Sequence, residues 1–157
     1  MIVSEIIHED FINYRKPSLF IGFPSCTWKC EKECGTEVCQ NKKLQTKSIF
    51  IEDTKIISYF INNPITNAVV CGGLEPFDSW KELQHFLCLF RRCCNADIVI
   101  YTGYYENEIQ DKILWLKNNI SNIIVKFGRY IPNQVSHYDK VLGVKLASDN
   151  QYAVQIS

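Results

Sequence analysis

Four cysteines lie within one short segment of this 157-residue chain, at Cys26, Cys30, Cys34 and Cys39. So dense a group of thiols indicates either a metal site or a set of disulfide bonds. As thiolates, the side chains are the soft ligands that zinc and iron-sulfur clusters prefer. The segment directly follows Ser18–Phe23, an apolar run that predicts a strand. The rest of the sequence has to decide between metal binding and disulfides.

The composition argues against disulfides, membranes and nucleic acid. The N-terminal residues show no basic stretch followed by an apolar one, so we expect a cytoplasmic protein with reduced thiols. The length suits a single domain, residues 1–157, that buries enough surface to fold without cross-links. No apolar run is long enough to span a bilayer, and 17 basic residues balance 17 acidic ones. Binding to nucleic acid or to a membrane is therefore not expected.

Apolar β-rich runs alternate with helical patterns along the chain, which predicts an α/β fold. Strands separated by helices pair in parallel with right-handed crossovers, so the sheet is expected to be mostly parallel. Asp78 is a candidate N-cap for the second helix. The predicted strands are 18–23, 68–72, 97–101, 123–127 and 141–145, and the predicted helices are 49–60, 78–94 and 106–118.

Three other short motifs follow predicted strands, just as the cysteine segment does. In sheets of this kind, ligands bind beyond the carboxyl ends of the strands. We therefore expect all four loops to converge on one rim. The three motifs are Gly72-Gly-Leu-Glu75-Pro76, Thr102-Gly-Tyr104 and Phe127-Gly-Arg129.

The cysteine spacing favours an iron-sulfur cluster over zinc. Structural zinc sites usually combine two close pairs of ligands, whereas the first spacing here is Cys-x3-Cys and no second pair lies elsewhere. Three cysteines holding a cubane cluster with one open iron fit better. A non-enzymatic protein stays open as an alternative, with zinc or an electron-transfer cluster in the cysteine loop and a structural Gly-Gly-Leu-Glu-Pro loop.

These motifs resemble those of the radical S-adenosylmethionine enzymes, and among them the small activating proteins of anaerobic ribonucleotide reductase. Cys39-Gln-Asn41 is similar to the family's Cys-aromatic-Asn, Gly72-Gly-Leu-Glu75-Pro76 to its Gly-Gly-Glu/Asp-Pro, and Tyr101-Thr-Gly-Tyr104 to its Tyr-Thr-Gly-Tyr. Gly128-Arg-Tyr-Ile131 and Ser148-Asp-Asn150-Gln151 resemble two segments of the reductase activators, Gly-Arg/Pro-Phe-Ile and Ser-Ser-Asn-Gln. The matches follow the family's order and cover nearly the whole chain.

Two features depart from the family pattern. The family's Cys-x3-Cys-x2-Cys becomes either Cys-x3-Cys-x3-Cys, ending at Cys34, or Cys-x3-Cys-x8-Cys, ending at Cys39. The second departure is Leu74, which is inserted before Glu75 and shifts the backbone groups that face a ligand.

The resemblance favours Cys39 as the third cluster ligand. In the family an apolar or aromatic residue near the adenine precedes this cysteine, and Asn follows it two positions later. Val38 and Asn41 meet both conditions, whereas Cys34 follows Glu33, whose charge is costly to bury beside a purine. The expected cluster ligands are Cys26, Cys30 and Cys39, with Cys34 as the alternative third ligand.

The resemblance also implies a partial (βα) barrel, a 4Fe-4S cluster, and S-adenosylmethionine as the ligand of the open iron. The two glycines would allow the methionine moiety to approach closely, and the glutamate would help neutralise its ammonium group. The threonine would serve the ribose, and a lysine or Arg129 would offset the carboxylate. The expected cofactor-binding residues are Val38, Asn41, Gly72, Gly73, Glu75, Thr102 and Lys126.

The implied activity is that of an oxidoreductase. An electron from an external donor such as flavodoxin or ferredoxin would cleave S-adenosylmethionine to methionine and a 5'-deoxyadenosyl radical. The radical would then take a hydrogen from a glycine of a partner glycyl-radical enzyme, here anaerobic ribonucleotide reductase. Two alternatives keep the radical chemistry but change its target, either to a small molecule or to another client, as in the formate-lyase activators.

Overall fold

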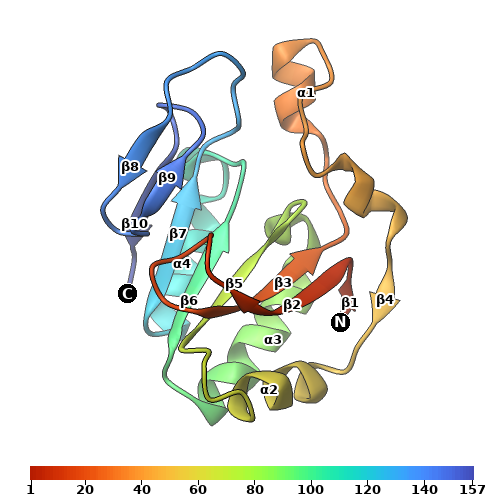
Figure 1. Cartoon of the computed structure of the whole chain (residues 1–157), viewed down its shortest axis with the longest axis vertical. Helices are drawn as coiled ribbons and strands as arrows, with labels where there is room; N and C mark the ends of the chain where they lie inside the picture. The colour runs from red at the N-terminus through yellow and green to blue at the C-terminus, as the bar shows by residue number, and fades with distance from the viewer.

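A computed structural model describes residues 1–157. At its centre lies a six-stranded sheet with the order β10-β7-β6-β5-β3-β2 (Figure 1). The four inner strands run parallel to one another, and each outer strand runs antiparallel to its neighbour. The inner strands are β3 (Ser18–Phe23), β5 (Ala68–Gly73), β6 (Asp97–Tyr101) and β7 (Ile123–Phe127), and the outer strands are β2 (Glu5–Asp10) and β10 (Tyr152–Gln155). The fold is α/β and is consistent with a partial radical S-adenosylmethionine barrel.

Three helices cover one face of this sheet (Figure 1). They are α2 (Asp53–Ile61), α3 (Trp80–Cys93) and α4 (Gln110–Asn119). Four apolar side chains at helical spacing on α3 are fully buried: Leu83, Phe86, Leu87 and Phe90. They belong to a core of 24 buried residues, whereas a second core of nine buried residues lies on the other face of the sheet. Successive strand residues alternate between the two cores, which explains why the inner strands are apolar throughout.

The shorter elements lie around the sheet. Strand β1 (Ile2–Val3) pairs with β4 (Ile49–Phe50), and β8 (His137–Asp139) pairs with β9 (Val144–Leu146). A six-residue helix, α1 (Lys29–Cys34), projects beyond the end of the sheet (Figure 1). Three 3₁₀ helices complete the fold: η1 (Lys42–Thr46), η2 (Pro76–Ser79) and η3 (Glu106–Glu108). None of the helices has the length and apolar character needed to cross a bilayer.

The four inner strands confirm the sequence predictions, but the helix starts were predicted too early. The predicted helix 49–60 begins only at Asp53, because Ile49 and Phe50 form hydrogen-bonded β4 instead. The prediction that Asp78 caps a helix is wrong, since Asp78 lies inside η2 and α3 begins at Trp80. The predicted helix 106–118 is divided into η3 and α4.

The last predicted strand was also displaced. Residues 141–143 form a turn, and β9 begins at Val144. The carboxylate of Asp139 accepts hydrogen bonds from the backbone N–H groups of Val141 and Leu142, both at 2.9 Å. An aspartate that binds the backbone a few residues ahead favours a turn over a strand. The strand therefore starts after the turn that Asp139 stabilises.

Candidate iron-sulfur and cofactor site

The loops that follow β3, β5, β6 and β7 meet around one cavity of about 350 Å³. This volume falls within the range of small-molecule and cofactor sites. Three of the four clustered cysteines line the cavity, and so do residues from each of the other three motifs. Those expected residues that line it are Cys26, Cys30, Cys39, Asn41, Gly73, Glu75, Thr102 and Lys126. The convergence expected from the strand ends is present in the structure.

Three residues from the expected or alternative set do not line this cavity: Cys34, Val38 and Gly72. Cys34 is the last residue of α1, and Gly35, with a left-handed φ of 68°, caps the helix. Val38 is half-buried just before the third cysteine of the cavity. The structure therefore brings together the thiols at 26, 30 and 39 and leaves the thiol at 34 outside the cavity.

Burial controls the ionisation of the three cavity thiols. It raises the pKa of Cys26 to about 12, and it also raises the pKa of Cys30 and of Cys39. In the metal-free chain these thiols are therefore protonated, and metal binding has to remove their protons. All eight cysteines of the chain are free of disulfide bonds. No three His, Cys, Asp or Glu side chains are gathered closely enough to hold a single metal ion.

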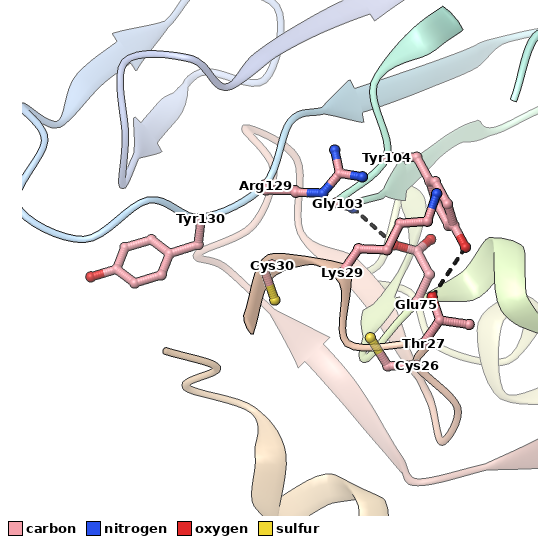
Figure 2. Close-up of a pocket in the computed structure, with 9 residues that line it drawn as sticks. All are labelled: Cys26, Thr27, Lys29, Cys30, Glu75, Gly103, Tyr104, Arg129 and Tyr130. Carbon is pink, nitrogen blue, oxygen red and sulfur yellow. Dashed lines mark hydrogen bonds between the residues drawn. The ribbon is translucent and has the colours of Figure 1, made fainter. Parts of the chain in front are cut away.

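Three thiols around one cavity suit a cubane cluster, in which each thiolate binds a different iron. A second, smaller pocket of about 70 Å³ adjoins them and shares Cys26 and Cys30 with the larger cavity. Figure 2 shows these two cysteines together with the other seven residues that line the smaller pocket. The side chain of Tyr130 points away from the other labelled residues in this view. The two pockets therefore share two of the three thiols, together with Glu75, Gly103 and Tyr130.

Glu75 is a buried carboxylate that lines the cavity. It is only 5% exposed. Its Oε1 accepts hydrogen bonds from the Thr102 hydroxyl at 2.8 Å and from the Phe77 N–H at 3.1 Å. Its Oε2 accepts one from the Gly103 N–H at 2.8 Å, which is drawn in Figure 2. Burial nevertheless raises the pKa of Glu75 to about 7. Because a carboxylate offers about four acceptor positions, one remains for a cationic ligand group.

Lys126 supplies a buried positive charge to the same cavity. It is 6% exposed, and its Nζ donates to the carbonyl of Gly128 at 2.8 Å. Burial lowers its pKa to about 8, while the nearby Glu75 acts in the opposite direction. An ammonium group has three donors, so two remain for an anionic ligand group. Of the two basic residues considered for a ligand carboxylate, Lys126 lines the larger cavity, whereas Arg129 lines only the smaller pocket.

The two glycines of the Gly-Gly-Leu-Glu motif allow β5 to pack closely against β3. A Cβ at Gly72 would lie 2.9 Å from the Phe20 ring, and a Cβ at Gly73 would lie 2.9 Å from Gly22 Cα. Gly73 also has a φ of +85°, which disfavours any other residue. Its carbonyl accepts a hydrogen bond from the Asn41 side chain at 3.0 Å. Asn41 thereby ties the end of the cysteine segment to the end of β5.

Asp78 was not identified as a site residue from the sequence. Its carboxylate accepts hydrogen bonds from the Thr27 N–H at 2.7 Å and from the Tyr104 hydroxyl at 2.6 Å. It therefore joins the cysteine loop to the loop after β6. Only its position two residues after Glu75-Pro76, in a loop at a strand end, offered a sequence signal. That signal was used for a helix cap instead.

Glu108 is a second residue that sequence reasoning missed. It binds Arg129 at 2.6 Å and Lys29 at 3.0 Å. The hydrogen bond from Arg129 lowers the pKa of Glu108 to about 2, so its charge is permanent at neutral pH. Lys29 belongs to the cysteine helix α1, and Arg129 to the loop after β7. No sequence pattern distinguishes Glu108 from its acidic neighbour Glu106.

Comparisons with known proteins agree with this geometry. The profile of one family, described as a 4Fe-4S single cluster domain, matches residues 16–150, which include every expected site residue. Comparison with curated protein sequences and with solved structures gives no significant match. The matched segment contains the three thiols that line the cavity and all four converging loops. The chain therefore belongs to the 4Fe-4S single cluster domain family, which consists largely of radical S-adenosylmethionine activating enzymes.

Proposed function

We propose that this protein is a radical S-adenosylmethionine activating enzyme that generates a glycyl radical on a partner enzyme. One observation carries the proposal: three thiols share a cavity with a buried carboxylate and a buried ammonium group at the carboxyl ends of parallel strands. A 4Fe-4S cluster held by these three thiols would pass an electron from an external donor to S-adenosylmethionine and so allow its reductive cleavage. The protein has to hold the cluster, orient the cofactor and exclude water.

The residues of the cavity suit these tasks. Cys26, Cys30 and Cys39 hold the cluster in this proposal. The free acceptor position of Glu75 suits the ammonium group of a methionine moiety, and the free donors of Lys126 suit its carboxylate. Two opposite charges that line one cavity would favour a single orientation of an amino acid group. The chain therefore offers a complementary partner to both charged groups at the amino acid end of S-adenosylmethionine.

A reductase activator is the favoured kind of enzyme because of two segments near the C-terminus. Gly128-Arg-Tyr-Ile131 and Ser148-Asp-Asn-Gln151 are the segments that resemble the activators of anaerobic ribonucleotide reductase. The Ile131 N–H donates to the Ser148 hydroxyl at 3.2 Å. Gly128 and Gln151 both line the cavity. These segments favour anaerobic ribonucleotide reductase as the client, and we propose an external donor such as flavodoxin or ferredoxin as the source of the electron.

The first test is anaerobic reconstitution with iron and sulfide, followed by chemical reduction in the presence of S-adenosylmethionine and assay of 5'-deoxyadenosine. We expect product from the wild type and from Cys34→Ala, and none from Cys39→Ala. Product from Cys39→Ala but not from Cys34→Ala would reverse the choice of third ligand. A stable cluster that forms no product, or tight zinc binding without a cluster, would favour an electron-transfer or structural protein.

A second test addresses the client. The reconstituted protein is mixed with an anaerobic ribonucleotide reductase, and the partner is examined by electron paramagnetic resonance. A glycyl radical gives a doublet, because the unpaired electron couples to the one remaining α-hydrogen, and α-deuterated glycine collapses the splitting. The doublet with this partner supports the proposal. Formation of 5'-deoxyadenosine without any radical on the reductase would favour a formate-lyase-type client or a small-molecule substrate.

A further inference from the structure

The helix that carries the second cysteine has no hydrophobic anchor. Helix α1 is six residues long and buries none of its side chains. Isolated helices shorter than about 12 residues are marginally stable in water, so packing or charge must hold this one. It also projects beyond the end of the sheet, away from both cores (Figure 1). Its position therefore depends on the charged residues along it.

One side of α1 is fixed to the sheet through Arg129. The guanidinium group of Arg129 is buried, with 3% of its side chain exposed. It pairs with Glu108 at 2.6 Å and, through Nε, with Glu33 of α1 at 3.3 Å. Lys29 of α1 binds the same Glu108 at 3.0 Å. Since Lys29 and Glu33 are four residues apart, both lie on one side of the helix, and Figure 2 shows Lys29 near Arg129.

Glu31 lies on the other side of α1 and contacts the segment that returns to the cavity. Its Oε1 accepts a hydrogen bond from the Cys39 N–H at 3.4 Å. Its Oε2 pairs with Lys42 at 3.5 Å. The Glu31 side chain is 17% exposed, compared with 68% for Glu37, which also pairs with Lys42. Glu31 therefore connects α1, which is fixed on its other side, to the backbone of Cys39.

We propose that Glu31 is a positioning residue that places Cys39 at the cavity and so makes the lengthened cysteine spacing usable. The eight residues between Cys30 and Cys39 would otherwise allow many loop conformations, and closing such a loop costs entropy. Glu31 fixes one such conformation, because it binds the Cys39 backbone from α1, and Arg129 holds the other side of this helix. The purpose assigned to Glu31 rests on the proposed cluster, but the contact itself belongs to the metal-free chain.

The first experiment measures amide hydrogen exchange of residues 36–42 in the reduced, metal-free protein. Glu31→Ala removes the acceptor of the Cys39 N–H, and we expect exchange in this segment to become about fivefold faster. Glu31→Gln keeps an acceptor oxygen and should stay within about twofold of the wild type. Glu37→Gln is the matched control and should also stay close to the wild type. Exchange in Glu31→Ala equal to that in the wild type would overturn the proposal, as would equal exchange in Glu31→Gln and Glu31→Ala.

The second experiment measures iron retention by the reconstituted protein in the presence of a chelator. We expect Glu31→Ala to lose iron about fivefold faster than the wild type, and Glu31→Gln and Glu37→Gln to match the wild type. Iron loss from Glu31→Ala at the wild-type rate would contradict a role at the cluster. If the wild type assembles no cluster but the exchange results hold, the proposed function fails while the positioning of Cys39 by Glu31 stands.

Discussion

Gly73 shows at the residue scale why the cofactor motif needs glycine in this fold. It has a φ of +85°, and a Cβ there would lie 2.9 Å from both Gly22 Cα and Phe23 N. We expect Gly73→Ala to destabilise the metal-free protein by about 1–3 kcal/mol, measured by urea unfolding. Gly103→Ala is the control, because its Cβ would meet nothing closer than 3.7 Å. Equal stability of the two variants would show that Gly73 does not need its left-handed conformation.

The ionisation of Glu75 gives a prediction about pH. Its pKa rises from an ordinary value of 4.5 to about 7 on folding, because the group is buried. The folded chain therefore holds this proton more tightly than the unfolded chain, so stability falls as the pH rises from about 4.5 to about 7. We expect this group to contribute a fall of about 3 kcal/mol, which Glu75→Gln should lack. Parallel pH profiles for the two proteins, measured by urea unfolding without metal, would contradict it.

Residue identity at the strand ends could be predicted, but the partners of those residues could not. Glu75 and Thr102 were placed correctly at the cavity because each follows an apolar strand. Asp78 and Glu108 were missed because their importance comes from Tyr104 and Arg129, which approach them only in the folded chain. A carboxylate on a turn looks the same in sequence whether it faces water or a buried arginine.

At the scale of elements, η2 is linked to two neighbouring loops through the Asp78 carboxylate. Tyr104→Phe removes the hydroxyl that donates to Asp78 at 2.6 Å and keeps the ring, over which the Lys29 ammonium lies at 4.5 Å. We expect a loss of about 1–2 kcal/mol in the free energy of unfolding, because a hydrogen bond to a carboxylate is lost. Tyr138→Phe is the control, since Tyr138 is 62% exposed. If both variants unfold at the same urea concentration, the link from Tyr104 to Asp78 contributes nothing to stability.

The elements themselves were predictable where a buried periodic pattern ran through them. All four inner strands and the buried side of α3 follow from apolar runs and helical spacing. Strands β1, β4 and β8 were not predicted, because two or three residues carry no periodic signal, and β9 only overlaps the predicted strand 141–145. Ile49 and Phe50 fall within the predicted helix 49–60, yet both are exposed and pair with β1. Pairing with a distant strand determines the secondary structure of these segments, and such pairing cannot be inferred from the local pattern of a single sequence.

At the scale of the whole molecule, the cores and the cysteine segment are separate. The sheet and its helices contain both cores, whereas Leu44 is the only buried residue between 24 and 50. The sheet therefore does not depend on the cluster for its folding. We expect the iron-free protein to unfold cooperatively in urea, and the cluster to add stability only through its binding to the folded state.

The same separation predicts where a protease cuts first. The cysteine segment offers trypsin five lysines between residues 29 and 47, whereas the irregular segment 128–136 offers only Arg129, which is 3% exposed. In the iron-free protein we expect the first tryptic cut, located by mass spectrometry, between residues 29 and 47. Reconstitution should slow this cut, because three bonds to the cluster tie the segment at both ends and cleavage requires local opening. A first cut elsewhere, or the same rate with and without the cluster, would show that the cysteine segment opens no more readily than the rest of the iron-free fold.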